Sequence, residues 1–278
     1  MLKLLLNLIL ISSTLGAFSS CKKKSSTPED IIETPVTNES TLIKIGETYL
    51  LGAKAKAVIY ANKAFETGYN EVYVSLLDSL DGSKLNNCHF SLSPSSNDGS
   101  GNQNLPCENS NDSLAVNGYF ASAAIFTKAG AASQCFLNFS IHNHKNNLYG
   151  SGSLGVAVLA QTPIKVTSLS TTDNSTFVIA LISPATPKVG INDFEIVLQK
   201  KSPGSNFAAV EDYKIEIDPV MPSMGHGSPN NVNPTHRGKG HYSGKVNFTM
   251  TGLWRVNLKL THNDSLITSA PFIELSIK

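Results

Sequence analysis

Residues 241–261 read HYSGKVNFTMTGLWRVNLKLT, and apolar side chains recur at every second position along most of this stretch. The apolar positions on one face are Tyr242, Val246, Phe248 and Met250, followed by Trp254, Val256, Leu258 and Leu260. A period of two is typical of β-strands that hold one face against a core and the other in water. Thr251-Gly252 is a turn signal between the two runs. The stretch therefore predicts two strands joined as a β-hairpin.

The same periodicity extends outward from this hairpin. Phe194, Ile196 and Leu198 alternate with their neighbours, and the last strand is expected at residues 272–277. Beyond the N-terminal region no stretch shows helical periodicity, and Gly, Pro, Asn and Ser turns separate the short runs. Short alternating strands between such turns predict an all-β fold, an antiparallel β-sandwich of immunoglobulin-like architecture.

Two motifs occur twice at one fixed spacing. Residues 68–72 (GYNEV) recur as 190–194 (GINDF), and residues 126–130 (FTKAG) recur as 248–252 (FTMTG). Both pairs are 122 positions apart, because 68 and 126 become 190 and 248. A repeat of this length indicates tandem domains rather than a solenoid of short units.

The repeat sets the expected domain boundaries. Residues 168–174 are polar and lack alternation, so they mark the junction. We expect a first sandwich domain at residues 46–168, the more degenerate copy, and a second at residues 175–278.

The N-terminal residues predict export. Lys3 precedes an apolar run, and small residues lead up to Cys21. This pattern is that of a secretory signal, and a cysteine at this place resembles the bacterial lipobox. We expect residues 1–20 to be a lipoprotein signal peptide and Cys21 to carry the lipid, with an ordinary signal peptide cut nearby as the alternative. Residues 21–45 are polar and charged, which predicts a flexible tether.

The lipid on Cys21 makes the membrane the expected partner. Lys22 and Lys23 do not resemble a signal for retention at the inner membrane, so the interpretation is an outer-membrane lipoprotein that faces the periplasm. The net charge is only +1, which provides no strong field to attract nucleic acid.

Three cysteines remain after the lipidation site: Cys88, Cys107 and Cys135. An oxidising compartment could pair two of them. Cys88 with Cys107 is the favoured pair, because a loop would connect them. The alternative, that all three are small buried apolar residues, stays open.

Methionine and histidine gather in one segment of the second repeat. The candidate ligands are Met221, Met224, His226, His236 and Met250. They are expected on a long loop, between a strand ending near Asp218 and one starting near His241, and on the strand end that this loop faces. Thioether sulfur is a good ligand for Cu(I), and imidazole suits both oxidation states of copper. The pattern predicts a copper site, with no metal required for folding.

Ordinary packing is the alternative for these side chains. Methionine commonly fills cores, Met250 lies on the apolar face of its strand, and His226 between two glycines could be an exposed turn residue. Against this, Lys128 stands at the place of Met250 in the first repeat, and residues 93–101 contain neither Met nor His. Packing alone therefore does not require them.

The same segment carries a resemblance to a known family. Residues 221–227 (MPSMGHG), Pro234, residues 240–242 (GHY) and residues 248–254 (FTMTGLW) occur in an order that resembles the YtkA-like domain. The resemblance covers about residues 175–278. It implies a relation to FixH-type proteins linked with copper handling and oxidase assembly, so a copper protein or an oxidase assembly factor is an expected partner. The first repeat lacks the Met-Gly-His element and the Trp.

Nothing in the sequence assembles an acid, a base and a nucleophile, and a Gly-x-Ser-x-Gly elbow is absent. The chain is therefore expected not to be an enzyme. His142-x-His144 could place two ligands on one strand face, although a polar corner is the favoured interpretation. The functional hypothesis is a cell-envelope lipoprotein that sequesters or delivers copper. The alternative is a non-catalytic interaction or scaffold lipoprotein without a metal.

Overall fold

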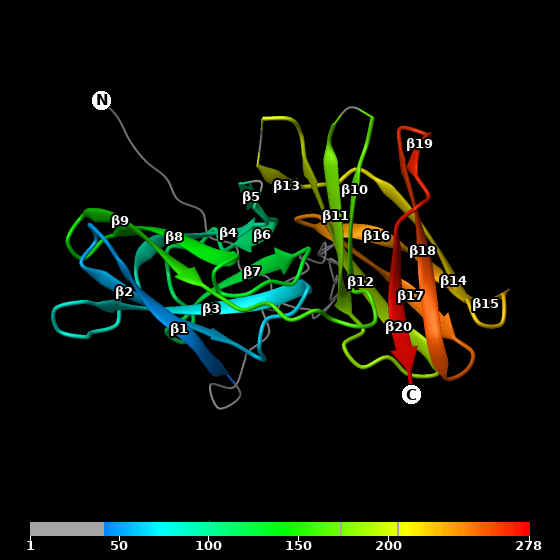
Figure 1. The fold of residues 1–278 in the computed structure, drawn as a ribbon, viewed down its shortest axis with the longest axis horizontal. Helices are drawn as coiled ribbons and strands as arrows, with labels where there is room; N and C mark the ends of the chain where they lie inside the picture. Colours follow the sequence, from blue (N-terminus) through cyan, green and yellow to red (C-terminus); the bar gives the residue numbers. More distant parts are fainter. Residues whose placement is uncertain (1–41, 100, 173, 205) are drawn as a thin grey trace, which may run out of the picture. The chain divides into compact units, whose positions relative to one another are not determined.

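A computed structural model describes residues 42–278, apart from residues 100, 173 and 205. The expected signal peptide, the lipidation site Cys21 and most of the expected tether lie outside this range. The regular elements of the described part are all β-strands, which confirms the all-β prediction. They form antiparallel pairs in four sheets, two for each half of the chain (Figure 1).

The first half comprises nine strands. They are β1 (Ile43–Leu50), β2 (Ala55–Ala61), β3 (Gly68–Asp78), β4 (Cys88–Asn97), β5 (Asn102–Asn104), β6 (Cys107–Asn109), β7 (Phe120–Phe126), β8 (Cys135–Asn143) and β9 (Leu148–Gly155). One sheet has the order β1-β2-β3-β7-β6 and the other has the order β5-β4-β8-β9. We call this pair of sheets the N-terminal sandwich.

The second half comprises the remaining strands. They are β10 (Val166–Ser170), β11 (Thr176–Ser183), β12 (Gly190–Lys201), β13 (Phe207–Ala209), β14 (Lys214–Met221), β15 (His226–Gly227), β16 (Val232–Gly238), β17 (His241–Phe248), β18 (Gly252–His262), β19 (Ser265–Thr268) and β20 (Phe272–Ile277). One sheet has the order β10-β11-β12-β17-β16, with β13 beside β12; the other has the order β15-β14-β18-β19, with β20 beside β18. We call this pair the C-terminal sandwich.

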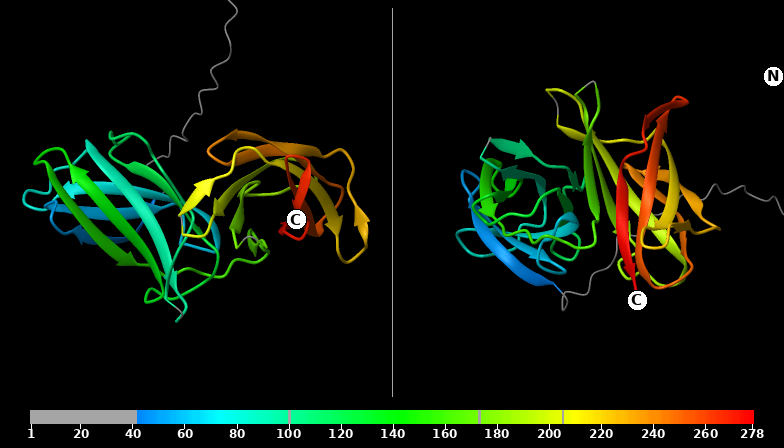
Figure 2. Two further views of the ribbon diagram at one scale, coloured as in Figure 1. Left: turned by 90° about the horizontal axis from the view of Figure 1, so that it is seen from above. Right: turned by 45° about the vertical axis from the view of Figure 1, so that its right-hand side comes forward.

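Each sandwich has its own cluster of buried apolar residues, contributed by strands of both of its sheets. Figure 2 shows the strands of these sheets from two further sides. The inward side chains are the ones that the alternation places on one face, so burial of apolar surface drives the strands together. The largest fully buried side chains of the C-terminal sandwich are Phe177, Phe194, Tyr242, Phe248 and Trp254. The strand β10 pairs with β11, so residues 166–168 join the second half rather than the first.

The two repeated motifs pair with each other in the same way in both sandwiches. Gly68 lies opposite Phe126, and Gly190 lies opposite Phe248. Asn70 donates to the carbonyls of Glu66 and Gly68 while its Oδ1 accepts from the Glu66 amide. Asn192 makes the same three bonds in the second sandwich. The same short motif thus fixes the start of β3 in one sandwich and the start of the equivalent strand, β12, in the other.

The prediction of a hairpin around Thr251-Gly252 is wrong. β17 pairs with β12 and β16, whereas β18 pairs with β14, β19 and β20, so the two strands belong to different sheets. The connection between them is an arch from one layer to the other. Alternation shows which face of a strand is buried, but it does not show which strand lies alongside.

The three described cysteines are unpaired thiols, so the expected bond between Cys88 and Cys107 is not formed. The Cys107 Sγ donates to the carbonyl of Leu92, which lies four residues along β4 from Cys88. Four residues of a strand span about 13 Å, whereas a disulfide needs Cα atoms within about 7 Å. Cys88 and Cys107 are therefore too far apart to be bonded.

The described part of the chain contains no helix that could cross a bilayer.

Candidate metal centres

The segment expected to be one long loop between Asp218 and His241 contains the strands β15 and β16 instead, and it begins with a tight hairpin. β14 runs on to Met221, and β15 begins at His226. The amides of Met224 and Gly225 donate to the Met221 carbonyl over 3.1 and 2.9 Å, and Gly225 has a φ of +66°. A glycine tolerates this left-handed conformation at little cost, which permits the sharp reversal.

The hairpin places Met221 directly opposite His226. Residues opposite each other in an antiparallel pair project on the same face, so the thioether and the imidazole are neighbours. Met221 is 3% exposed and belongs to the core of the C-terminal sandwich. Its Cε lies 3.1 Å from the point that a Cβ on Gly252 would occupy.

Trp254 connects this pair to Met250. The indole ring is fully buried, and its centroid lies 6.0 Å from that of His226 in an edge-on arrangement. The indole N–H donates to the Met250 carbonyl over 3.0 Å, while the Met250 side chain is partly exposed. Met221, His226 and the Met250 backbone therefore gather around one indole. Sequence reasoning did not place Trp254 in the site, although the resemblance already singled it out.

The other two predicted ligands are placed differently. Met224 lies on the hairpin turn and is exposed. His236 lies on β16, in the other sheet, and its Nε2 accepts the amides of Gly238 and Gly240 over 3.2 and 3.3 Å. These bonds occupy that nitrogen, so His236 stabilises the turn between β16 and β17.

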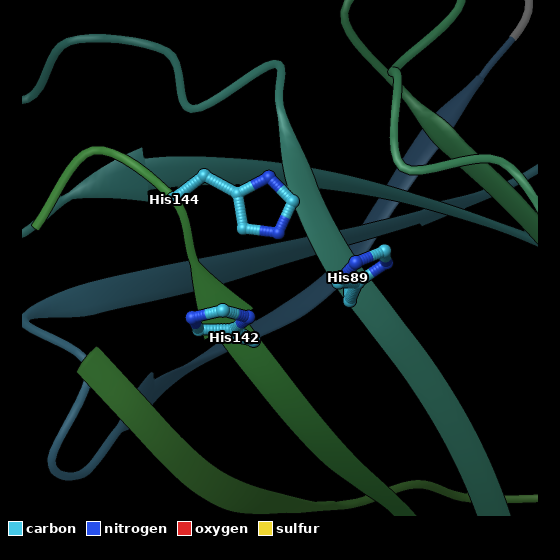
Figure 3. A group of neighbouring side chains, drawn as sticks. All are labelled: His89, His142 and His144. Carbon is cyan, nitrogen blue, oxygen red and sulfur yellow. The ribbon is translucent and has the colours of Figure 1, made fainter. Parts of the chain in front are cut away.

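A second group of possible ligands lies in the N-terminal sandwich. His89 on β4, His142 on β8 and His144 just after β8 bring their ligand nitrogens within 4.8 Å of one another (Figure 3). His89 and His142 are directly opposite each other in the β4–β8 pair. We call these three residues the histidine cluster. It could hold a metal ion, because each ring offers one nitrogen.

The rings of the histidine cluster pack closely. The His144 centroid is 4.6 Å from that of His89 and 4.8 Å from that of His142, edge-on in both cases. Burial lowers the pKa of His144, and the neighbouring imidazoles lower it further. The neutral ring, which is the form that binds metals, is therefore favoured.

Sequence reasoning noted His142 and His144 but missed His89. The missing residue is far away along the chain and joins the others only through the β4–β8 register. The local signal was the alternation of His89, Phe90, Ser91 and Leu92, which puts His89 on the outer face of its strand. That signal shows on which face of the strand His89 lies, but it does not show which strand lies alongside.

Comparisons with known proteins match the C-terminal sandwich to one family. Residues 172–259 match the model of the YtkA-like family, which confirms the expected resemblance. This stretch includes the Met221–His226 hairpin and Trp254. No curated protein sequence matches the chain.

Solved structures similar to the chain include bacterial adhesins. FdeC, an *Escherichia coli* adhesin, is 17% identical with a TM-score of 0.26, and the alignment covers 83% of this chain and 66% of that one. Invasin, a bacterial integrin-binding protein, is 14% identical with a TM-score of 0.26, covering 80% and 39%. A chimeric titin Z1Z2 is 12% identical with a TM-score of 0.20, covering 77% and 91%. The chain spans less than two thirds of the two bacterial structures, and at these scores the likenesses carry no argument about function.

Proposed function

We propose that this chain is an exported lipoprotein, anchored through Cys21, whose C-terminal sandwich binds a copper ion at the β14–β15 hairpin. The observation that carries the proposal is the pairing of Met221 with His226 beside Trp254. The family match over residues 172–259 includes these residues.

The donor set favours Cu(I). Thioether and imidazole ligands suit a soft monovalent ion, and no carboxylate is among them to attract a hard cation. A neighbouring indole adds electrostatic stabilisation for a cation. Met224, exposed on the turn, can fold over an ion held by Met221 and His226, and the Met250 sulfur is the fourth candidate donor. His236 is left out, because its Nε2 is already bonded.

The role that fits these parts is to sequester copper or hand it on. A partly exposed site, tethered to a membrane, can meet a second copper protein or an oxidase assembly factor. The proposed location is the outer membrane, facing the periplasm, with the lipid on Cys21 as the anchor.

The test is an anaerobic Cu(I) titration of the mature chain against a chromogenic chelator, with Cys21→Ser to prevent lipidation. One bound Cu(I) is expected, and Met224→Leu and His226→Ala should each weaken it by about tenfold or more. His262→Ala is the matched control, because it removes an imidazole from the same sandwich. Since Trp254 is the chain's single tryptophan, its fluorescence should change with Cu(I).

Two outcomes would contradict the proposal. One is that the wild-type chain takes up no Cu(I), which would leave a non-catalytic interaction or scaffold lipoprotein. The other is that Met224→Leu and His226→Ala bind Cu(I) as tightly as the wild type does.

A further inference from the structure

The histidine cluster lies on the outer face of the β4–β8 pair. Phe90 and Ile141 point into the sandwich, so the neighbouring His89 and His142 point outward. His144 lies in the turn just after β8, and this turn brings its ring to the other two (Figure 3). The three imidazoles therefore meet on a surface that a dissolved ion can reach.

Two asparagines fix which nitrogens are available. The Oδ1 of Asn147 lies 2.8 Å from the Nε2 of His142, and the Oδ1 of Asn87 lies 2.8 Å from the Nδ1 of His144. An amide oxygen can only accept, so these two ring nitrogens donate their protons. The Nδ1 of His142 and the Nε2 of His144 are left with free lone pairs. A ring that donates one N–H to an oxygen and offers the other nitrogen is the usual state of a metal-binding histidine.

Neighbouring groups hold these rings in place. Tyr149 on β9 stacks on His142, with centroids 4.1 Å apart and planes only 3° from parallel. Lys145, next to His144, bonds to Asp78 at 2.7 Å and also to Asp81 and Ser83. The turn that presents His144 is thus tied to another part of the same sandwich. The His89 ring, which is exposed, has the most room to adjust.

We propose that His89, His142 and His144 form a second metal site, one for a divalent transition ion such as Zn²⁺ or Cu²⁺. All three donors are imidazole nitrogens with no thioether among them, a set that suits these borderline ions, whereas Ca²⁺ prefers oxygen ligands. A tetrahedral ion about 2.0–2.1 Å from each nitrogen needs them about 3.3 Å apart. The ligand nitrogens lie within 4.8 Å of one another, so small rotations of the rings, above all of the exposed His89 ring, would have to shorten these distances. The fourth position opens to solvent, so water or a donor from another protein completes the coordination.

The test uses the mature chain with Cys21→Ser and Zn²⁺ as the metal, titrated against a chromogenic chelator. One Zn²⁺ per chain is expected at this site, and His89→Gln, His142→Gln and His144→Gln should each weaken it by about tenfold or more. His262→Gln is the matched control, and Met224→Leu separates this site from the copper hairpin; both should bind Zn²⁺ as the wild type does. His89→Gln is decisive if another variant fails to fold, because His89 is exposed.

A second measurement reads the ligand atoms. Long-range ¹H–¹⁵N spectra of the imidazoles should show Zn²⁺ on the Nδ1 of His142 and on the Nε2 of His144. Absence of Zn²⁺ uptake, unchanged affinity in His89→Gln, or metal on the opposite nitrogens would overturn the proposal. None of these results depends on whether the hairpin binds Cu(I).

Discussion

The two candidate sites differ in how deeply each is built into its sandwich. In the C-terminal sandwich, Met221 and Trp254 are core residues that also border the proposed copper site. In the N-terminal sandwich, the histidine cluster lies outside the core, on one face of a finished sheet. The first arrangement couples binding to packing, whereas the second permits the ligands to change with little effect on the fold.

A comparison of matching corners supports this distinction. β8 ends in His142-Asn143, and β18 carries His262 followed by Asn263. His262, however, stacks on Tyr213 at 4.7 Å and bonds to Asp212 at 2.9 Å. One sandwich thus closes the corner with an acid and an aromatic ring, while the other collects three imidazoles. The fold does not require the histidine cluster, so the proposed metal site would be an addition to a frame that both sandwiches share.

The largest expected effect concerns the site that borders a core, in the C-terminal sandwich. Trp254→Ala should lower the free energy of unfolding by about 3–5 kcal/mol, because it empties a large volume in the core. His89→Ala, on the exposed face, should change it by less than about 0.5 kcal/mol. Urea unfolding followed by circular dichroism measures both, since Trp254→Ala removes the only indole. Similar losses in the two variants would erase the contrast between the sites.

Met221 allows packing and ligation to be separated. Met221→Leu keeps most of the side-chain volume and should cost less than about 1.5 kcal/mol, whereas Met221→Ala should cost about 2–5 kcal/mol. Both remove the sulfur, so both should weaken Cu(I) binding by about tenfold or more. Urea unfolding and Cu(I) competition on the same samples provide the comparison. Retention of full Cu(I) affinity by Met221→Leu would exclude this sulfur as a ligand.

Asn147→Gly tests the partner of His142. Asn147 has a φ of +57°, so glycine keeps the turn while removing the amide oxygen. Loss of such an outer partner typically costs 10–100-fold in metal affinity, and we expect about tenfold for Zn²⁺. Asn263→Gly, at a φ of +47° in the C-terminal sandwich, is the matched control and should leave Zn²⁺ binding unchanged. Equal Zn²⁺ affinities in the two variants would show that the hydrogen bond does not prepare His142.

The smallest effect concerns the turn that presents His144. Lys145 donates to Asp78 and lowers the pKa of that carboxyl group. A lowered pKa in the folded state means that the pair stabilises the fold above the ordinary pKa of aspartate and stops doing so as the pH falls through the lowered value. Lys145→Met should therefore lower the urea midpoint at pH 7, and the difference should shrink as the pH falls below the ordinary pKa of aspartate. A difference that persists in acid would point to lost packing instead.

The sequence predicted the fold class because alternation is a local property of each strand. The family resemblance and the pairing of Met221 with His226 were also within reach, since those residues are five positions apart. The pairing of strands could not be predicted, because it depends on contacts between segments that are distant in the sequence. The arch between β17 and β18 was therefore mistaken for a hairpin, and His89 was left out of the histidine cluster. Likewise, the role of His236 follows only from the backbone amides that its ring accepts.

Gly252 lies at the start of β18 with a φ of +125°, a backbone conformation that residues other than glycine rarely adopt. The methyl group of Met221 also lies 3.1 Å from the point where a Cβ at position 252 would stand, which is a tight contact. A side chain at position 252 would therefore strain the backbone where β18 begins, and it would also displace the Met221 methyl group by a few tenths of an ångström. A substitution of Gly252 would thus disturb both the start of β18 and the Met221 sulfur of the proposed copper site, so the two cannot change independently at this position.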